Sequence, residues 1–381
     1  MRHIVHQNYA CIPIANGYNT ARPRGCVWKR PGVRHATNST AMGVLAIILV
    51  LIAISFCGFR KTDGFGLDSS LCLRGIMVLL VVFHHLPAES NSVAHYLQGA
   101  CGRYAVALFF FMSGYGLMTQ YVRKGREAVM QGYLVRRYTK LLLPWLVAVA
   151  FFYLAGGCSV TWGNIAENFR TGESIVPFGY FVEELAVFYL LFWVAYRFLP
   201  VGPALALCFL GTLGMIGAFI AWDWNPHWWI SSMAFPAGVA TVYMEKRLMR
   251  ARMWSAVAAA AMMALAGLLP NFTGMEELQF KLLRFSLLLT PLSCWVVYLL
   301  WPMVRVRTAA WVPLNFFGRI SYEMYILQGL AISWLGRADV PCAPLLTIMA
   351  AAAVGWCAWK FDAAVAPRIQ GLLQRYPKSS L

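Results

Sequence analysis

The chain has 381 residues, of which 60% are hydrophobic and only 12% are charged, and its formal net charge is +17. Soluble domains are about 45–50% apolar and about 25% charged, so the composition excludes an ordinary soluble fold. Most basic residues lie in short loops between apolar runs, where they orient membrane helices, so the charge does not predict a nucleic-acid partner.

Apolar segments of roughly the length that crosses a bilayer recur along the chain. Inside hydrocarbon the backbone must satisfy its own hydrogen bonds, so these segments are predicted to be helices; continuous apolarity also differs from the alternating pattern of a membrane barrel. We expect eleven spans, at residues 41–59, 71–88, 103–122, 141–157, 177–198, 203–222, 228–244, 255–269, 285–304, 312–335 and 341–361. The predicted fold class is all-α: a polytopic integral membrane helix bundle of about 10–11 transmembrane helices.

No convincing internal repeat or low-complexity stretch divides the chain, so residues 60–365 are expected to form one membrane domain. Before it we expect a basic, disordered tail at 1–40 and an extra transmembrane helix at 41–59, and after it a C-terminal tail at 366–381. An odd number of spans places the basic tail outside, against the positive-inside rule. Either the first helix is frustrated or the true start is Met42, and we favour the second explanation.

The distribution of basic residues predicts the orientation. Alternate loops, together with the residues from Lys360 onward, hold sixteen Lys and Arg side chains, whereas the intervening loops hold four. Because cytoplasmic loops carry the excess, we expect a multi-pass protein of the inner membrane with a cytoplasmic C-terminus. The helix at 71–88 then begins at the cytoplasmic side and ends in the outer half of the bilayer.

The ten cysteines are scattered through apolar segments without a CxxC pair or a Cys/His cluster. This pattern is typical of free cysteines that pack as small apolar side chains, so neither a metal site nor a disulfide framework is predicted. We expect no metal and no bound cofactor.

Ionisable side chains within spans are the informative residues of a membrane protein. Of seven histidines only His84 and His85 lie in a predicted span, and they share it with Arg74. On a helix Arg74 and His85 lie within about 20° of one face and about 16 Å apart, whereas His84 lies about 80° away. A cation and an imidazole on one face favour a protein-lined cleft. Alternatively, Arg74 reaches the interface and His85 is a hydrogen-bonded structural residue.

Other polar side chains within the spans are candidates for the same cleft: Ser113, Glu183, Glu184, Ser321, Tyr325 and Gln328. The last three recur at i, i+4 and i+7 and form a polar stripe, which lines either a cleft or a hydrogen-bonded seam between helices. Ser113 precedes Gly114, and such small residues let either another helix or a ligand approach closely.

The segment "YLVRRYTKLLLPW" places Arg136, Arg137 and Lys140 at the predicted cytoplasmic end of a span, before Pro144. Basic side chains at this place have two interpretations. They anchor the helix by the positive-inside rule, or they bind phosphate groups through charge-assisted hydrogen bonds.

Several segments resemble, in order, the signatures of the membrane acyltransferases of family 3. "LDSSLCLRGIMVLLVVFHH" resembles the family's opening helix, in which an Arg, ten residues and a His fall here on Arg74 and His85. Asp68 matches the acidic residue that commonly precedes this Arg, with two extra residues between them. "GRYAVALFFFMSGYGL" resembles the second signature, in which a Gly precedes an FF pair and a Ser-Gly-aromatic turn.

Two later segments extend the resemblance to most of residues 67–335. The basic motif of the family falls on Arg137 and Lys140, with Lys in place of the usual second Arg. "FFGRISYEMYILQGL" resembles the late signature but departs from it, because Gln328 stands where His is usual. The role of that His in relatives is therefore either taken here by the amide of Gln328 or absent.

The resemblance implies a membrane-bound O-acyltransferase that moves an acyl group, commonly acetyl, from cytoplasmic acyl-CoA to a hydroxyl of an extracytoplasmic glycan. In that chemistry His85 is the general base, since the pKa of an imidazole is ordinarily about 6.5. Arg74 guides the donor inward or pairs with Asp68, and His84 is a supporting or packing residue. The basic motif of Arg136, Arg137 and Lys140 holds the phosphates of the donor.

The expected partners are membrane lipids, acyl-CoA and a glycan or related acceptor. A competing hypothesis is a multi-pass transporter or lipid-linked sugar translocase, in which the same intramembrane charges relay protons. Transporters often contain inverted repeats with broken helices in matching halves, and the sequence shows none.

Overall fold

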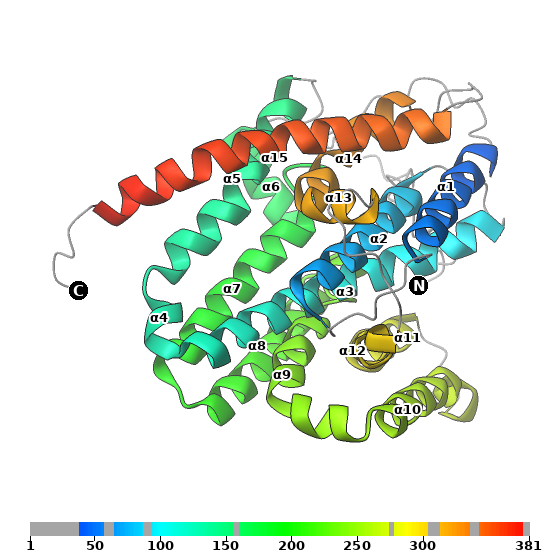
Figure 1. Cartoon of the computed structure of the whole chain (residues 1–381), viewed down its shortest axis with the longest axis vertical. Helices are drawn as coiled ribbons and strands as arrows, with labels where there is room; N and C mark the ends of the chain where they lie inside the picture. The colour runs from blue at the N-terminus through cyan, green and yellow to red at the C-terminus, as the bar shows by residue number, and fades with distance from the viewer. Residues whose placement is uncertain are drawn as a thin grey trace.

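The computed structural model describes residues 38–56, 65–86, 93–154, 160–273, 278–303, 313–335 and 343–375. Within these residues the chain is helical and has no strand, as the apolar segments predict (Figure 1). The basic tail before residue 38 lies outside the described residues, and so do both explanations offered for it.

The helices run in the following order. The first half contains α1 (Asn38–Phe56), α2 (Leu67–His85), α3 (Val93–Lys124), α4 (Arg126–Met130), α5 (Tyr133–Leu154), α6 (Trp162–Thr171), α7 (Tyr180–Phe198) and α8 (Val201–Ala221). The second half contains η1 (Pro226–Trp228), α9 (Ala234–Arg250), α10 (Arg252–Thr273), α11 (Leu278–Arg284), η2 (Phe285–Leu289), α12 (Thr290–Leu300), η3 (Trp301–Met303), α13 (Pro313–Arg319), α14 (Ser321–Leu335) and α15 (Ala343–Arg375).

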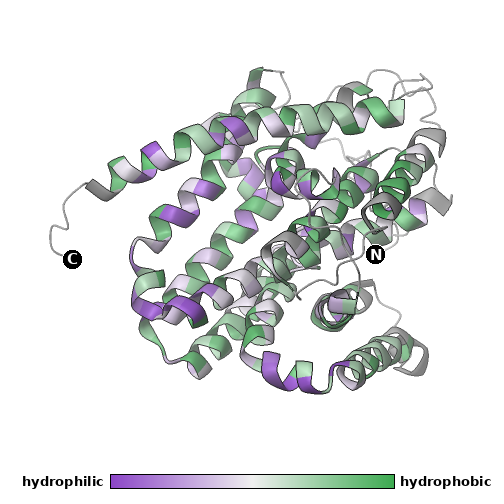
Figure 2. Ribbon diagram, viewed as in Figure 1, coloured by the Kyte–Doolittle hydropathy of each residue, from purple (hydrophilic) through white to green (hydrophobic). Residues whose placement is uncertain are grey.

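Among the described residues, five stretches of helix are long and apolar enough to cross a membrane: His95–Lys124, Tyr133–Leu154, Val201–Ala221, Leu282–Met303 and Leu345–Leu373. Shorter apolar helices cover Met42–Ile52, Ser69–His85 and Arg252–Ala266. Apolar residues dominate the helices, and hydrophilic ones gather around α4 and the end of α9 (Figure 2). The chain is therefore a multi-pass membrane protein.

Four details differ from the spans read along the sequence. Helix α3 begins ten residues before the predicted span, because residues 93–102 are also helical. The span at 312–335 is broken into α13 and α14 at Ile320, and α15 continues to Arg375 through most of the expected C-terminal tail. The short helix α6 was not expected. Thr161 caps its start, and Gly172, with a φ of 69°, ends it.

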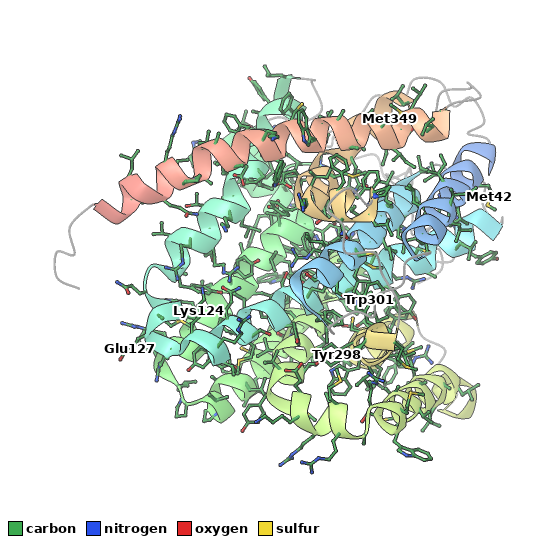
Figure 3. All side chains as sticks on the ribbon, viewed as in Figure 1. Met42, Lys124, Glu127, Tyr298, Trp301 and Met349 are labelled. Atoms are coloured by element: carbon green, nitrogen blue, oxygen red, sulfur yellow. The ribbon has the colours of Figure 1, made fainter. Side chains whose placement is uncertain are left out.

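The two ends of the bundle differ in charge. Helix α3 ends and α5 begins at what we name the basic end, where Lys124 and Glu127 lie together near α4 (Figure 3). Arg126 there donates a hydrogen bond to the carbonyl of Arg197, which ties α4 to the end of α7. The opposite end holds α6, the end of α8 and the start of α7. Because α2 precedes α3 in a hairpin, His85 lies at the opposite end.

Helices α3 and α9 cross at a reciprocal glycine contact. A Cβ at Gly114 would lie 2.2 Å from the carbonyl oxygen of Phe235, and a Cβ at Gly238 would lie 2.1 Å from that of Phe111. Each helix thus places a glycine against a carbonyl of the other. Ser113 therefore neighbours a closely packed crossing, one of the two roles expected for this small pair.

Helices α2 and α13 repeat the arrangement at the basic end. A Cβ at Gly75 would lie 2.0 Å from the carbonyl oxygen of Leu314, and a Cβ at Gly318 would lie 1.9 Å from that of Leu71. Trp301 adds a hydrogen bond from its indole to the hydroxyl of Ser69. The start of α2 is therefore held from two sides, which fixes the position of Arg74, the residue directly before Gly75.

Candidate active site along helix α2

The C-terminal end of α2 is capped by a side chain of α3. The amide of Gln98 donates hydrogen bonds to the carbonyls of Phe83 and Leu86, both at 2.9 Å. His84 lies against the same helix: its Nδ1 is 2.7 Å from the carbonyl oxygen of Gln98, and a Cβ at Gly102 would meet its ring at 2.2 Å. His84 is thus packed against α3.

His85 points toward a different element. Its imidazole lies against the ring of Phe178, with ring centroids 3.8 Å apart and planes inclined by 32°. His85 is the last residue of α2 and is partly exposed, so it lies at the end of the bundle opposite to the basic end.

Phe178 occupies an unusual turn. The amide of Gly179 donates to the carbonyl of Val176 at 3.0 Å, so residues 176–179 form a β-turn with Pro177 at its second position. Phe178, at the third position, has a φ of 66°. Turns of this type favour Gly or Asn there, since a bulky residue in the left-handed region is strained by about 1–3 kcal/mol. The ring of Phe178 also lies 3.1 Å from the Cβ position of Gly329.

Arg74 lies eleven residues earlier on α2, where it meets α7. Its guanidinium interacts electrostatically with Tyr189. The Tyr189 hydroxyl shares a hydrogen bond with Ser113 of α3 and also interacts with Arg137 of α5. Four helices therefore bring two guanidinium groups to one phenol. Among the described side chains no carboxylate forms an ion pair with Arg74 or Arg137.

The two ends of this face meet the same neighbouring segment. Arg74 meets Tyr189, and His85 meets Phe178, so the spacing of eleven residues on α2 is matched by eleven on the segment 178–189 that runs the other way. Since α2 is helical from Leu67 to His85, Arg74 and His85 lie on one face about 16 Å apart. We name the region between this face and residues 178–189 the α2–α7 seam.

The basic motif divides into side chains with different partners. Arg136 donates to the carbonyls of Gln131 and Val129, the second at 2.8 Å, and so braces the turn before α5. Arg137 donates to the side chain of Gln120 at 2.9 Å and lies over the rings of Tyr133 and Tyr189, 5.9 Å from each centroid.

The third member of the motif, Lys140, is exposed and interacts electrostatically with Asp362 of α15. Of the three cations, only Arg137 is shown in contact with Tyr189 and hence with the α2–α7 seam. This division within the motif was not expected from the sequence.

The two glutamates of α7 point to different neighbours. Glu184 is buried and accepts a hydrogen bond from the hydroxyl of Ser232, which precedes α9. Glu183 accepts from Ser174 at 3.3 Å, in the segment before α7. Within the part of the chain that the structure describes, neither carboxylate hydrogen-bonds to His85 or Arg74, and both link neighbouring elements.

The polar stripe of α14 is buried throughout. Tyr325 packs its ring against Phe109 and Phe181, at centroid distances of 6.3 and 5.0 Å, and Ser321 is 6% exposed. Gln328 is fully buried, and neither atom of its amide has a hydrogen-bond partner among the described residues. A buried amide without partners indicates a place for water or a polar ligand. The residue after it, Gly329, lies against Phe178.

Asp68 lies on α2, but its side chain is outside the described part, so its predicted pairing with Arg74 remains a prediction. No group of three or more His, Cys, Asp or Glu able to hold a metal occurs in the residues covered by the structure. The cysteines found there, among them Cys72 and Cys208, are free.

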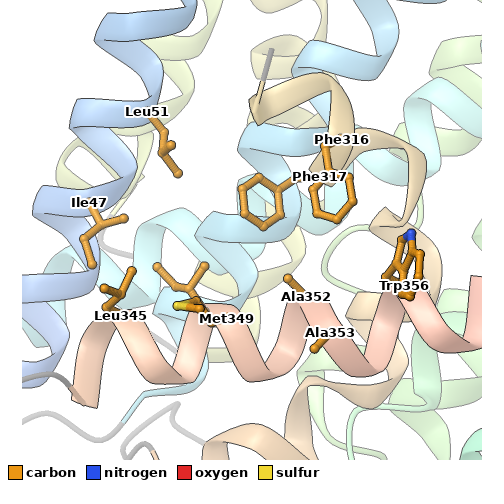
Figure 4. Close-up of a pocket in the computed structure, with 10 residues that line it drawn as sticks. Ile47, Leu51, Phe316, Phe317, Leu345, Met349, Ala352, Ala353 and Trp356 are labelled. Atoms are coloured by element: carbon orange, nitrogen blue, oxygen red, sulfur yellow. The ribbon is translucent and has the colours of Figure 1, made fainter. Parts of the chain in front are cut away.

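An apolar groove lies elsewhere, between α1, α13 and α15 (Figure 4). Its volume is about 480 Å³, and Leu51, Phe317, Met349 and Trp356 are among its lining residues. None of the candidate site residues lines it. The groove is therefore distinct from the α2–α7 seam. Its apolar lining on a membrane protein suits contact with lipid chains.

Three residues near the candidate site were missed by the sequence interpretation. Tyr189 and Phe178 are aromatic residues of an apolar span, with nothing to separate them from packing residues except the Pro before Phe178. His227 lies outside the spans, contacts the ring of Tyr180 at a centroid distance of 4.5 Å and interacts electrostatically with His85. Burial lowers the pKa of His227 to about 4, so its ring is uncharged at neutral pH.

Comparison with known proteins agrees with the motifs. No curated protein and no solved structure matches the chain. The family described as an acyltransferase domain, acyltransferase family 3, matches residues 66–361, which cover most of the sequence and include α2 through the greater part of α15. The chain therefore belongs to acyltransferase family 3 and carries an acyltransferase domain.

Proposed function

We propose that the protein is a membrane-bound O-acyltransferase that moves an acyl group, acetyl in the simplest case, from cytoplasmic acyl-CoA to a hydroxyl of an extracytoplasmic glycan or related acceptor. The observation that carries this proposal is the α2–α7 seam. It has two cations at the basic end, Arg74 and Arg137, and an imidazole at the opposite end, His85.

The basic end suits the donor. Among the described side chains no carboxylate pairs with either guanidinium, which favours an anionic ligand, because an uncompensated charge in a membrane protein is costly. The phosphates of acyl-CoA are such ligands and form strong charge-assisted hydrogen bonds with arginine. By the positive-inside rule this end is cytoplasmic, the compartment of acyl-CoA.

The opposite end suits the acceptor. The ordinary pKa of an imidazole lies near the working pH of an enzyme, so an imidazole can accept the proton of a hydroxyl while the oxygen attacks the thioester carbonyl. The C–O bond of the new ester forms, the C–S bond breaks, and CoA leaves as the thiol after protonation. We assign the role of proton acceptor to His85. The partly exposed position of His85 at the outer end of α2 supports access from the extracytoplasmic side.

The function is tested with the purified full-length protein in nanodiscs. We expect CoA release from acetyl-CoA that increases when a hydroxylated glycan acceptor is added. When the gene is deleted, mass spectrometry should show surface glycans that are lighter by the mass of one acyl group. The competing transporter or translocase hypothesis predicts acceptor-dependent flux without CoA release. Flux of that kind with intact acyl-CoA would reject the proposed reaction.

The division of the basic motif gives a quantitative expectation. Arg137→Ala should raise the KM for acyl-CoA about 10- to 100-fold with a smaller change in kcat, because a hydrogen bond to a charged group contributes about 1.5–3 kcal/mol. Arg136→Ala is the matched control: it should lower thermal stability, since two loop carbonyls lose their donor, and leave KM near the wild-type value. Equal effects of the two variants on KM would contradict donor binding by Arg137.

A further inference from the structure

The ring of Phe178 lies between His85 and Gly329. It lies against the imidazole at a centroid distance of 3.8 Å, with the two planes inclined by 32°. Its Cε2 is 3.1 Å from the Cβ position of Gly329, so a larger residue at 329 would press on the ring. One face of the imidazole is therefore covered by an aromatic ring that has little room to move away while α14 stays in place.

The backbone shows that this ring is held against local preference. Phe178 follows Pro177 in the β-turn closed by Gly179 and Val176, and its φ of 66° belongs to the region where Gly and Asn are usual. Bulky residues in this region are outliers that persist only when the surroundings impose them. A glycine is available one position later, at Gly179, yet the aromatic side chain occupies the left-handed position.

We propose that Phe178 is a positioning and specificity residue: its ring covers the imidazole of His85 and admits only short acyl groups to it. This inference rests on the proposed function of His85 as the proton acceptor. An acyl chain that reaches the imidazole along the α2–α7 seam must share space with the Phe178 ring. An acetyl group needs the least displacement of the ring, and each added methylene needs more.

The first test measures the cover directly and needs no activity. Full-length protein is treated with diethyl pyrocarbonate, and fragment ions that separate His85 from His84 report carbethoxylation, with His95 of the same molecule as reference. Phe178→Gly keeps the turn conformation and removes the ring, so the ratio of His85 to His95 labelling should rise. Phe178→Asn, which also tolerates a positive φ, should give the same result and guards against a folding defect of either variant.

The matched control is Asp223, the other non-glycine residue with a positive φ in the described part, at 54°. It is exposed and follows α8. Asp223→Gly makes the same backbone change away from His85 and should leave the labelling ratio unchanged.

The second test measures selectivity. CoA release is compared for acetyl-CoA, butanoyl-CoA and octanoyl-CoA, and Phe178→Gly should lower the wild-type preference for acetyl by about tenfold or more, because each methylene in an apolar pocket changes discrimination about 10–200-fold. A packing role of Phe178 would instead scale all three rates together.

The outcomes separate this proposal from the proposed function. Unchanged His85 labelling in both Phe178 variants, or an unchanged chain-length ratio, overturns the proposal, as does wild-type protein that accepts octanoyl as readily as acetyl. If His85→Ala keeps the wild-type rate of CoA release, the proposed function fails, and the labelling ratio still decides whether Phe178 covers His85.

Discussion

Replacing His85 with alanine is expected to lower acceptor-dependent CoA release by about 10²–10⁴-fold, the usual contribution of a general base. The loss should appear in kcat more than in the KM for acyl-CoA, because the donor phosphates are expected to bind about 16 Å away, at Arg74 and Arg137. The measurement is steady-state CoA release by protein purified in nanodiscs, compared with wild type at equal folded concentration.

His84 provides the control within the same helix turn. His84→Ala removes a ring that packs against Gly102 and contacts the carbonyl of Gln98, whereas it leaves the imidazole of His85 against Phe178. We expect some loss of thermal stability and a rate within a few-fold of wild type. A His85→Ala protein that elutes as wild type and retains its rate would remove His85 from the chemistry, and a larger effect at His84 would reverse the assignment of the two.

The glycine contact between α3 and α9 is expected to be highly sensitive to added volume. Gly114→Ala and Gly238→Ala each place a Cβ about 2 Å from a backbone carbonyl oxygen, where no flexible side chain can yield. Overpacking of this kind typically costs about 1–3 kcal/mol and occasionally more, so we expect a sharp fall in folded yield and in the Tm of the detergent-solubilised protein.

Gly116 is the matched control for this experiment. It lies on α3 two residues beyond Gly114, and a Cβ there meets nothing within 4 Å. Gly116→Ala should therefore stabilise the helix by about 0.5–1 kcal/mol through the lower backbone entropy of alanine in the unfolded chain. Since Gly114 and Gly238 belong to one crossing, the double variant should lose less than the sum of the two. Equal behaviour of Gly114→Ala and Gly116→Ala would show that the helices are not in this close contact.

The sequence predicted the fold class because the length and apolarity of a segment are local properties, and in the described residues five stretches of helix are long and apolar enough to cross a membrane. Its errors lie where tertiary packing decides. Helix α3 starts ten residues before the expected span, and Ile320 divides the expected span 312–335 into two helices. The close approach of Gly318 to Leu71 is visible only when α13 is placed beside α2.

The candidate site was predictable in part for the same reason. Arg74 and His85 share a face because helix geometry depends on spacing alone, and the structure retains that face. The position of His85 at the end of α2, and the different surroundings of Arg136 and Arg137, depend on neighbouring helices that no spacing rule specifies. Tyr189 and Phe178 are uncharged aromatic residues in an apolar segment, so nothing in the sequence indicated that they lie beside Arg74 and His85.

The two glycine crossings also restrict how the molecule can move during turnover. A slide of α2 along α13, or of α3 along α9, by one residue would drive a Cβ onto a carbonyl, so each pair is expected to move as a rigid unit. Residues 178–189 are on neither pair, and α5 beside them carries Pro144 within its length. Any widening of the route between donor and acceptor is therefore expected to come from displacement of α7 and its preceding turn against a stationary α2, which keeps Arg74 and His85 in line throughout the cycle.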